Sequence, residues 1–190
     1  YTLVYTLSLH DALPISGLSA QLAYMLVMYR HRKKLQERLV AMIDEQTASQ
    51  RGKPGFVGQN SIVQHCGSLR NLYIGEHSKI IGAAELQNGA IVSQPQAPLF
   101  IGRGVMALNF IIESDSHVDS GAMLDHVYVG QGCRIGKQFS AEHSCFFANC
   151  EGFHGEACSL FAGPYSVTHH KATLLIAVHV SFYNAGSGSN

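Results

Sequence analysis

The sequence predicts a mainly β protein, a parallel β-helix of hexapeptide repeats preceded by an amphipathic α-helical segment. The first observation is a six-residue spacing of apolar positions, at Val129, Ile135, Ala141, Phe147 and Phe153, with Ile112, Val118 and Leu124 just before them. The second is an aliphatic residue followed by Gly, at Val57-Gly58, Ile74-Gly75, Ile101-Gly102, Val129-Gly130 and Ile135-Gly136. A β-sandwich would instead show a period of two.

Each short strand is expected to place one apolar side chain inside the coil, and the adjacent Gly lets the backbone turn where a Cβ would clash. Three such sides make a coil of about 18 residues, which predicts about six coils between Gly55 and Ser166. The register slips by one residue between Leu69 and Ile74, and Asn88 to Phe100, with two prolines, predicts an extruded loop. Small residues four places after the aliphatic ones are also expected inside, although Phe139 and Glu151 break the pattern: Ser61, Gly67, Ser78, Ser116, Ala122, Cys133 and Cys145.

The two ends of the chain lack the repeat pattern of its middle. Thr6 to Ser16 reads TLSLHDALPIS, the one-frame translation of a common short-read sequencing adapter, so residues 1–16 are interpreted as an assembly artefact and not as native sequence. Residues 17–54 are expected to form a helical segment and linker, and residues 55–190 a β-helix domain. An apolar run from Leu174 to Phe182 without a polar cap predicts that this domain is truncated at its C-terminus.

Composition gives a balanced formal net charge of zero and five cysteines. The zero net charge provides no global attraction to nucleic acid or to anionic membranes. An odd number of cysteines without a CxxC pair favours reduced thiols in a cytoplasmic protein, and Cys133 and Cys145 are interpreted as small core residues. No apolar stretch reaches the roughly 20 residues that a membrane-spanning helix needs.

An amphipathic helix or helix pair is predicted from Ser19 to Gln46, because apolar residues recur there at steps of three and four. Its middle, Arg30 to Lys34, is strongly basic. This basic run is interpreted as a solvated helix face, with a phosphate, coenzyme or anionic-lipid docking patch as the alternative. Thr47 to Gly55 is expected to be a linker, and the helical segment is expected to cover one end of the solenoid.

The densest polar cluster lies between Asn149 and Lys171. Residues one coil apart stack in space, so His154 is expected near His169 or His170, with Glu151 or Glu156 beside them. A His oriented by a carboxylate serves as a general base. Two other interpretations stay open: a polar surface without chemistry, and a metal site at His154, His169, His170 and Glu151, against which stands the lack of tight ligand spacing.

The stretch Val129 to Ala177, most specifically the block from Asn149 to Lys171, resembles the left-handed β-helix hexapeptide transferases, the trimeric UDP-N-acetylglucosamine acyltransferase-like superfamily. Within that superfamily it resembles a long bacterial family of unknown function. The resemblance implies a left-handed coil, a homotrimer, active sites in the grooves between neighbouring β-helices, and an acyl-coenzyme A or acyl-carrier protein donor. The acceptor it implies is a sugar or sugar nucleotide.

Carried onto this sequence, the resemblance implies that His154 is the catalytic base. Glu151 or Glu156 would orient it, and Asn149, His169, His170 and Lys171 would contact substrate. The acyltransferases commonly place Gly before this His, whereas Phe153 stands there in this chain. Backbone N–H groups of Gly152 and Gly155 would stabilise an oxyanion. The alternative function is a non-catalytic β-helix scaffold, or a ligand- or metal-binding protein.

Overall fold

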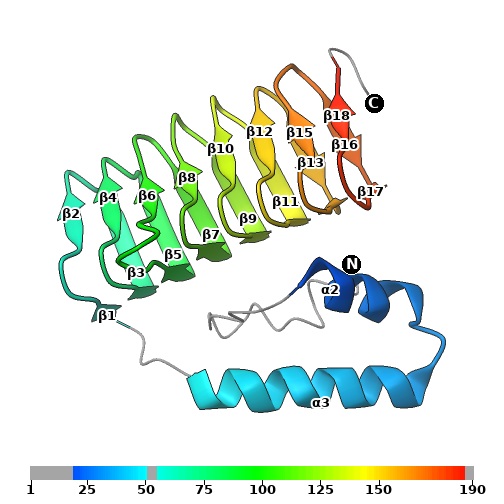
Figure 1. Ribbon diagram of the computed structural model, residues 1–190. Helices are drawn as coiled ribbons and strands as arrows, with labels where there is room; N and C mark the ends of the chain where they lie inside the picture. The colour runs from blue at the N-terminus through cyan, green and yellow to red at the C-terminus, as the bar shows by residue number, and fades with distance from the viewer. Residues whose placement is uncertain (1–18, 51–54, 187–190) are drawn as a thin grey trace.

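The computed structural model describes residues 19–50 and 55–186. It shows a mainly β protein, a parallel β-solenoid of about 8 turns with two short helices near the N-terminus (Figure 1). The predicted fold class, a parallel β-helix after a helical segment, is therefore confirmed. The handedness of the coil stays a prediction of the resemblance.

The helices are α2 (Ala20–Met28) and α3 (Lys33–Gln50), and the strands form two parallel ladders (Figure 1). The first ladder contains β1 (Phe56–Val57), β3 (Ser68–Ile74), β5 (Glu85–Val92), β7 (Met106–Glu113), β9 (Met123–Val129), β11 (Ser140–Phe146), β13 (Glu156–Cys158), β14 (Phe161–Ala162), β16 (Thr173–Leu175) and β17 (Val178–His179). The second contains β2 (Ile62–Gln64), β4 (Lys79–Ile81), β6 (Phe100–Ile101), β8 (His117–Val118), β10 (Arg134–Gly136), β12 (Glu151–Phe153), β15 (Val167–Thr168) and β18 (Asn184–Ala185).

The coil is 17 residues long in most turns, since Ile62 pairs with Lys79 and His117 with Arg134. The expected length of about 18 is thus one residue too long. The solenoid also continues past Ser166, to β18. The predicted extruded loop is narrower than expected, because β5 runs to Val92 and an isolated bridge joins Gln94 to Ala97 beyond it.

The shorter coil explains why the six-residue spacing drifts off the core. Val129 pairs with Phe146, not with Phe147, and Ile135 pairs with Gly152, not with Phe153. A slip of one residue moves a strand side chain to the opposite face. Phe147 is therefore buried in a separate cluster against α2, and Phe153 lies on the outside, against the ring of His169.

Most of the small positions are inside the coil as expected. Ser78, Ser116, Ala122 and Cys133 are buried, and the Ser116 hydroxyl donates to the carbonyl of Gly130 at 2.8 Å. These short polar side chains satisfy backbone carbonyls within the core. Cys145 is also buried, but it belongs to the cluster that faces α2.

Large aromatic side chains in the core are matched by glycines one coil away. A Cβ on Gly89 would lie 2.2 Å from the ring of Phe110, and a Cβ on Gly152 would lie 3.2 Å from that of Phe139. Phe110 and Phe139 are both fully buried. Phe139, which interrupts the pattern of small residues, is thus accommodated because the next coil carries Gly152 and Gly155 above it.

One corner of the solenoid is a column of non-glycine residues with positive φ. It comprises Asn71, Asn88, Asn109, His126 and His143. The Asn71 amide donates to Asn88 at 2.9 Å, and the Asn88 amide donates to Asn109 at 3.2 Å. Asn is among the residues that tolerate the left-handed region best, so the corner is built from side chains that also bond the coils together.

The helices lie along the side of the solenoid, not over its end, so the expected end cap is wrong for the described residues. Ala23 and Leu26 of α2 are buried in a cluster with Ala90, Ile111 and Tyr128, which point outward from the first ladder. Figure 1 shows α2 between the solenoid and α3. An outward row of apolar residues on this ladder needs a cover, and α2 provides it.

The helix pair itself matches the prediction closely at its start. Ser19 caps α2, and its hydroxyl accepts from the N–H of Leu22 at 3.2 Å. At the other end α3 runs to Gln50, so Thr47 to Gln50 are helical and not linker. The basic run from Arg30 to Lys34 is exposed around the turn between the helices. Neither described helix combines the length and the apolar character that crossing a bilayer requires.

The Gly89–Phe110 contact gives a direct test of this core. Gly89→Ala should lower the free energy of unfolding by about 1–3 kcal/mol, because the added methyl group overlaps a ring that has no free space to enter. Urea unfolding of the purified variant measures the loss. Adding Phe110→Leu to Gly89→Ala should recover part of it, and an unchanged unfolding midpoint in the single variant would contradict the packing described.

Candidate functional site

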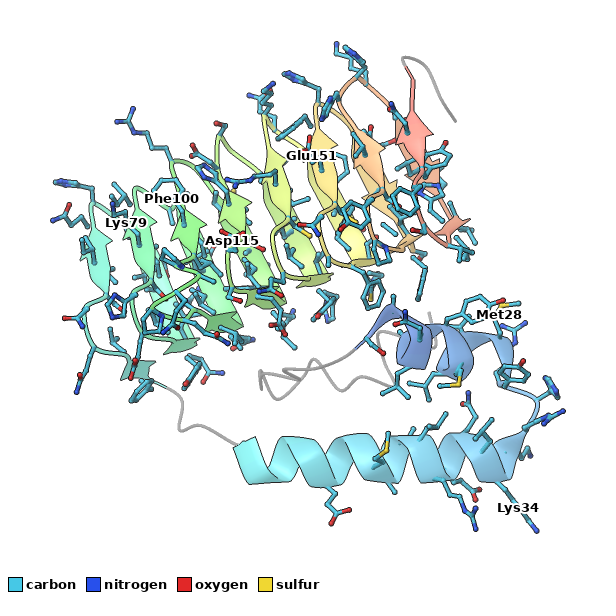
Figure 2. The ribbon with its side chains drawn as sticks, viewed as in Figure 1. Met28, Lys34, Lys79, Phe100, Asp115 and Glu151 are labelled. Atoms are coloured by element: carbon cyan, nitrogen blue, oxygen red, sulfur yellow. The ribbon has the colours of Figure 1, made fainter. Side chains whose placement is uncertain are left out.

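The outer surface of β10, β12 and β15 carries the side chains that the sequence singled out. Gly152 points inward, so its neighbours Glu151 and Phe153 point outward from the second ladder. Figure 2 shows Lys79, Phe100 and Glu151 along the strands of this ladder. We call the patch formed by Glu151, Phe153 and His169 the site wall.

Glu151 and His169 form a direct contact between adjacent coils. His169 Nε2 hydrogen-bonds Glu151 Oε2, and the two side chains are 48% and 37% exposed. A carboxylate oxygen only accepts, so Nε2 donates to it, and in the neutral ring Nδ1 then keeps its lone pair. The His169 ring also lies 5.2 Å from the Phe153 ring at an angle of 32°. His169 is therefore held by a carboxylate on one side and by an aromatic ring on the other.

A shallow hollow of about 380 Å³ adjoins the site wall at the corner after β12. We call it the corner depression; it is lined by His154, Glu156, Lys137 and Lys171 among others. Lys137 links the two patches, because its Nζ lies 4.8 Å from the centre of the Phe153 ring. Two ammonium groups against one carboxylate suit an anionic ligand group.

The structure brings together part of the predicted cluster and separates the rest. His169 lies beside Glu151, as the coil spacing predicted, whereas His154 lies in the corner depression with Glu156 and Lys171. Among the described residues no carboxylate bonds the His154 ring. Asn149 lies at a different corner, where its side chain lies over Gly132. Of the two carboxylates expected beside His154, Glu151 bonds His169 and Glu156 lines the corner depression with His154.

His170 is exposed, and its carbonyl accepts from the Thr168 hydroxyl at 3.3 Å. His154, His169, His170 and Glu151 do not gather as a metal site would require. No cluster of three or more His, Cys, Asp or Glu side chains suited to a metal exists within residues 19–50 and 55–186, so far as side chains are described.

Three of the cysteines, Cys133, Cys145 and Cys150, are buried core residues, whereas Cys66 and Cys158 are half-buried. All five are free thiols. The Cys133 thiol donates to the carbonyl of Phe147 at 3.0 Å, and that of Cys150 to the carbonyl of Gly163 at 3.3 Å. Burial raises the pKa of Cys145 to about 12. A thiol that stays protonated is inert as a nucleophile.

Glu113, at the end of β7, was not among the site residues predicted from the sequence. Its Oε1 is buried and has no hydrogen-bond partner in the described part of the chain, and desolvation raises the pKa of the carboxyl group from 4.5 to about 7. It lines a second cavity of about 310 Å³ between the start of α2 and the solenoid. One signal is present in the sequence, a charged residue directly after the apolar run Phe110 to Ile112, but a charged residue there is equally typical of a strand end.

Comparison with known proteins adds a family without a known activity. Residues 11–190 match the model of a family described as a domain of unknown function (DUF4954). An uncharacterized protein of Treponema pallidum (strain Nichols) is 29% identical over 122 residues, which are 64% of this chain. The match spans only 14% of that relative's own length. No solved structure matches.

Glu113 should make stability depend on pH in a defined direction. The folded chain holds this proton up to a pKa of about 7, against 4.5 for an ordinary Glu. The group therefore favours folding fully below pH 4.5, and this contribution is lost as the pH rises through about 7. Glu113→Gln removes that loss, so its melting temperature should exceed that of the parent by about 5 °C at pH 8 and by little at pH 4.

Thermal unfolding followed by circular dichroism measures both values. If the melting temperatures of Glu113→Gln and the parent differ by the same amount at pH 4 and at pH 8, the carboxyl group is not desolvated.

Proposed function

The chain belongs to the family described as a domain of unknown function (DUF4954), and we propose that it is a hexapeptide-repeat transferase that acylates a sugar or sugar nucleotide. The observation that carries the proposal is the contact between Glu151 and His169 on the exposed site wall. A histidine that is held by a carboxylate and is about half exposed is suited to general base catalysis. The donor in this proposal is an acyl-coenzyme A or an acyl-carrier protein.

His169 takes the role of base that the resemblance assigned to His154. Its Nε2 is occupied by Glu151, so Nδ1 is the atom that accepts a proton. Glu151 fixes the ring and stabilises the imidazolium that forms. His154, at the rim of the corner depression, then becomes a substrate contact together with Glu156.

The step consists of one substitution at a thioester carbonyl. The acceptor hydroxyl or amine loses its proton to His169 Nδ1 while its heteroatom bonds the carbonyl carbon, which gives a tetrahedral oxyanion. Collapse of that oxyanion breaks the carbon–sulfur bond, and the thiolate leaves with the proton from the imidazolium. Atoms and charges balance without a redox partner or a metal.

The corner depression supports binding of a phosphorylated substrate. Lys137 and Lys171 both line it, and Lys137 also reaches the Phe153 ring on the site wall. Lys is a common phosphate ligand because its ammonium group acts as a compact charge. Both the coenzyme donor and a sugar nucleotide carry such phosphates. In this proposal a homotrimer places the flat site wall against a neighbouring solenoid, which would enclose the substrate.

A non-catalytic scaffold is the second candidate, and exposed apolar side chains favour it. Ile176 is 84% exposed and Phe182 is 80% exposed, on the last coils described. Exposed apolar patches mark interaction surfaces in many proteins. In that case the site wall would contribute to assembly and not to a reaction.

Release of free thiol from acetyl-coenzyme A in the presence of a UDP-sugar tests the proposal. His169→Asn should lower kcat by at least about 100-fold, because the general base is lost. Glu151→Gln should lower kcat by about 10-fold or more, and Lys171→Ala should raise KM with little change in kcat. An exposed, partly screened ion pair contributes less than about 1 kcal/mol to stability, so these variants should stay folded.

His65→Asn is the matched control, because His65 is an exposed corner residue of an early coil. Its kcat should equal that of the parent. Equal turnover by His169→Asn and the parent, or a kcat effect confined to His154→Asn, would contradict the role of His169. Absence of turnover by the parent, with light scattering that shows a changed assembly state in Glu151→Gln, would favour the scaffold.

A further inference from the structure

The cavity beside Glu113 is separate from the site wall and takes no part in the proposed transfer. Glu113, Tyr128 and Phe147 contribute its functional side chains, and the start of α2, Ser19 to Gln21, closes one side. Its volume is about 310 Å³, which is within the range of cavities that hold small ligands. It lies on the solenoid face that α2 covers, because Tyr128 and Phe147 belong to the cluster with Ala23 and Leu26.

Three of the residues that line the cavity, Glu113, Gly130 and Phe147, lie on neighbouring coils. Ile112 pairs with Val129, and Val129 pairs with Phe146, so Glu113, Gly130 and Phe147 follow one another in a column across three coils. Strands in a sheet are about 4.8 Å apart. The backbones of Glu113 and Phe147 are thus roughly two strand spacings apart, and both residues line the cavity together with Gly130.

Among the described residues, no cationic side chain compensates the negative charge of the Glu113 carboxylate. No Lys, Arg or His lines the cavity, and Oε1 of Glu113 is buried without a partner in the described residues. The other titratable group facing Glu113 is the Tyr128 hydroxyl, whose pKa is raised by burial and then by the Glu113 charge, so it stays neutral. A buried carboxylate of this kind costs free energy unless a cation accompanies it.

Two aromatic rings favour a particular kind of cation. The Tyr128 and Phe147 rings lie 5.5 Å apart at 49°, and both line the cavity with Glu113. Aromatic faces attract alkylammonium groups through their negative quadrupole. A divalent metal would require several oxygen ligands, and this cavity offers one carboxylate.

We propose that this cavity binds a small organic ammonium ion, with the Glu113 carboxylate as its counter-ion and the Tyr128 and Phe147 rings as its apolar walls. The cavity volume of about 310 Å³ has room for a head group of the size of choline or ethylammonium. The site would couple ligand binding to the position of α2, because Ser19 to Gln21 form one of its walls.

Isothermal titration calorimetry on the full chain tests this with choline and with its neutral carbon isostere, 3,3-dimethylbutan-1-ol. At pH 8 the chain should bind choline and should bind the alcohol at least about tenfold more weakly. A titration with ethylammonium shows whether the cavity prefers a primary or a quaternary ammonium ion. Glu113→Gln should weaken choline binding by about tenfold or more. Glu142→Gln, an exposed Glu on β11 outside the cavity, should leave it unchanged.

Affinity for choline should fall about tenfold between pH 8 and pH 6, because Glu113 takes up its proton with a pKa of about 7. Equal binding of choline and the alcohol would show a simple apolar cavity. Unchanged choline binding in Glu113→Gln, or no binding of choline or ethylammonium at about 10 mM, would overturn the proposal.

Discussion

The structure depends on closing each coil with residues that accept positive φ. Most coils have 17 residues, as in the pairing of His117 with Arg134, and each must turn sharply between its sides. Asn, His and Gly occupy most of these turns, because the left-handed region costs these residues least. Where Asn71, Asn88 and Asn109 stack, their side-chain amides also bond one coil to the next. Turn geometry and coil-to-coil cohesion are thus provided by the same residues.

Because the coils stack regularly, the inner and outer surfaces of the strands have different compositions and different roles. Inside, aromatic residues such as Phe110 and Phe139 are matched by glycines a coil away. Outside, one face of the first ladder is apolar and is covered by α2. Glu113, at the end of β7 in this ladder, lines a cavity that the start of α2 also lines. The outer face of the second ladder stays open and presents Glu151, Phe153 and His169. The site wall and the cavity beside Glu113 therefore lie on different faces of one repeating unit.

The sequence predicted the repeat and its class because aliphatic residues and glycines recur at a spacing that only a solenoid explains. It did not predict the coil length, since a hexapeptide spacing suggests 18 residues and the one-residue difference changes which of Phe146 and Phe147 points inward. Stacking predicted that Glu151 or Glu156 would lie beside a histidine, but the choice among His154, His169 and His170 depends on this register. The cavity beside Glu113 could not be predicted, because the start of α2, which forms one of its walls, is far away in the sequence.

The base assigned here depends on the contact between Glu151 and His169. NMR spectra of the imidazole nitrogens detect this contact without a substrate. In two-dimensional ¹H–¹⁵N spectra of the histidine side chains, Glu151→Gln should shift the ring resonances of His169 and leave those of His154 and His170 in place, because only His169 bonds this carboxylate. A shift at His154 with His169 unchanged would contradict the register and, with it, the assignment of the base.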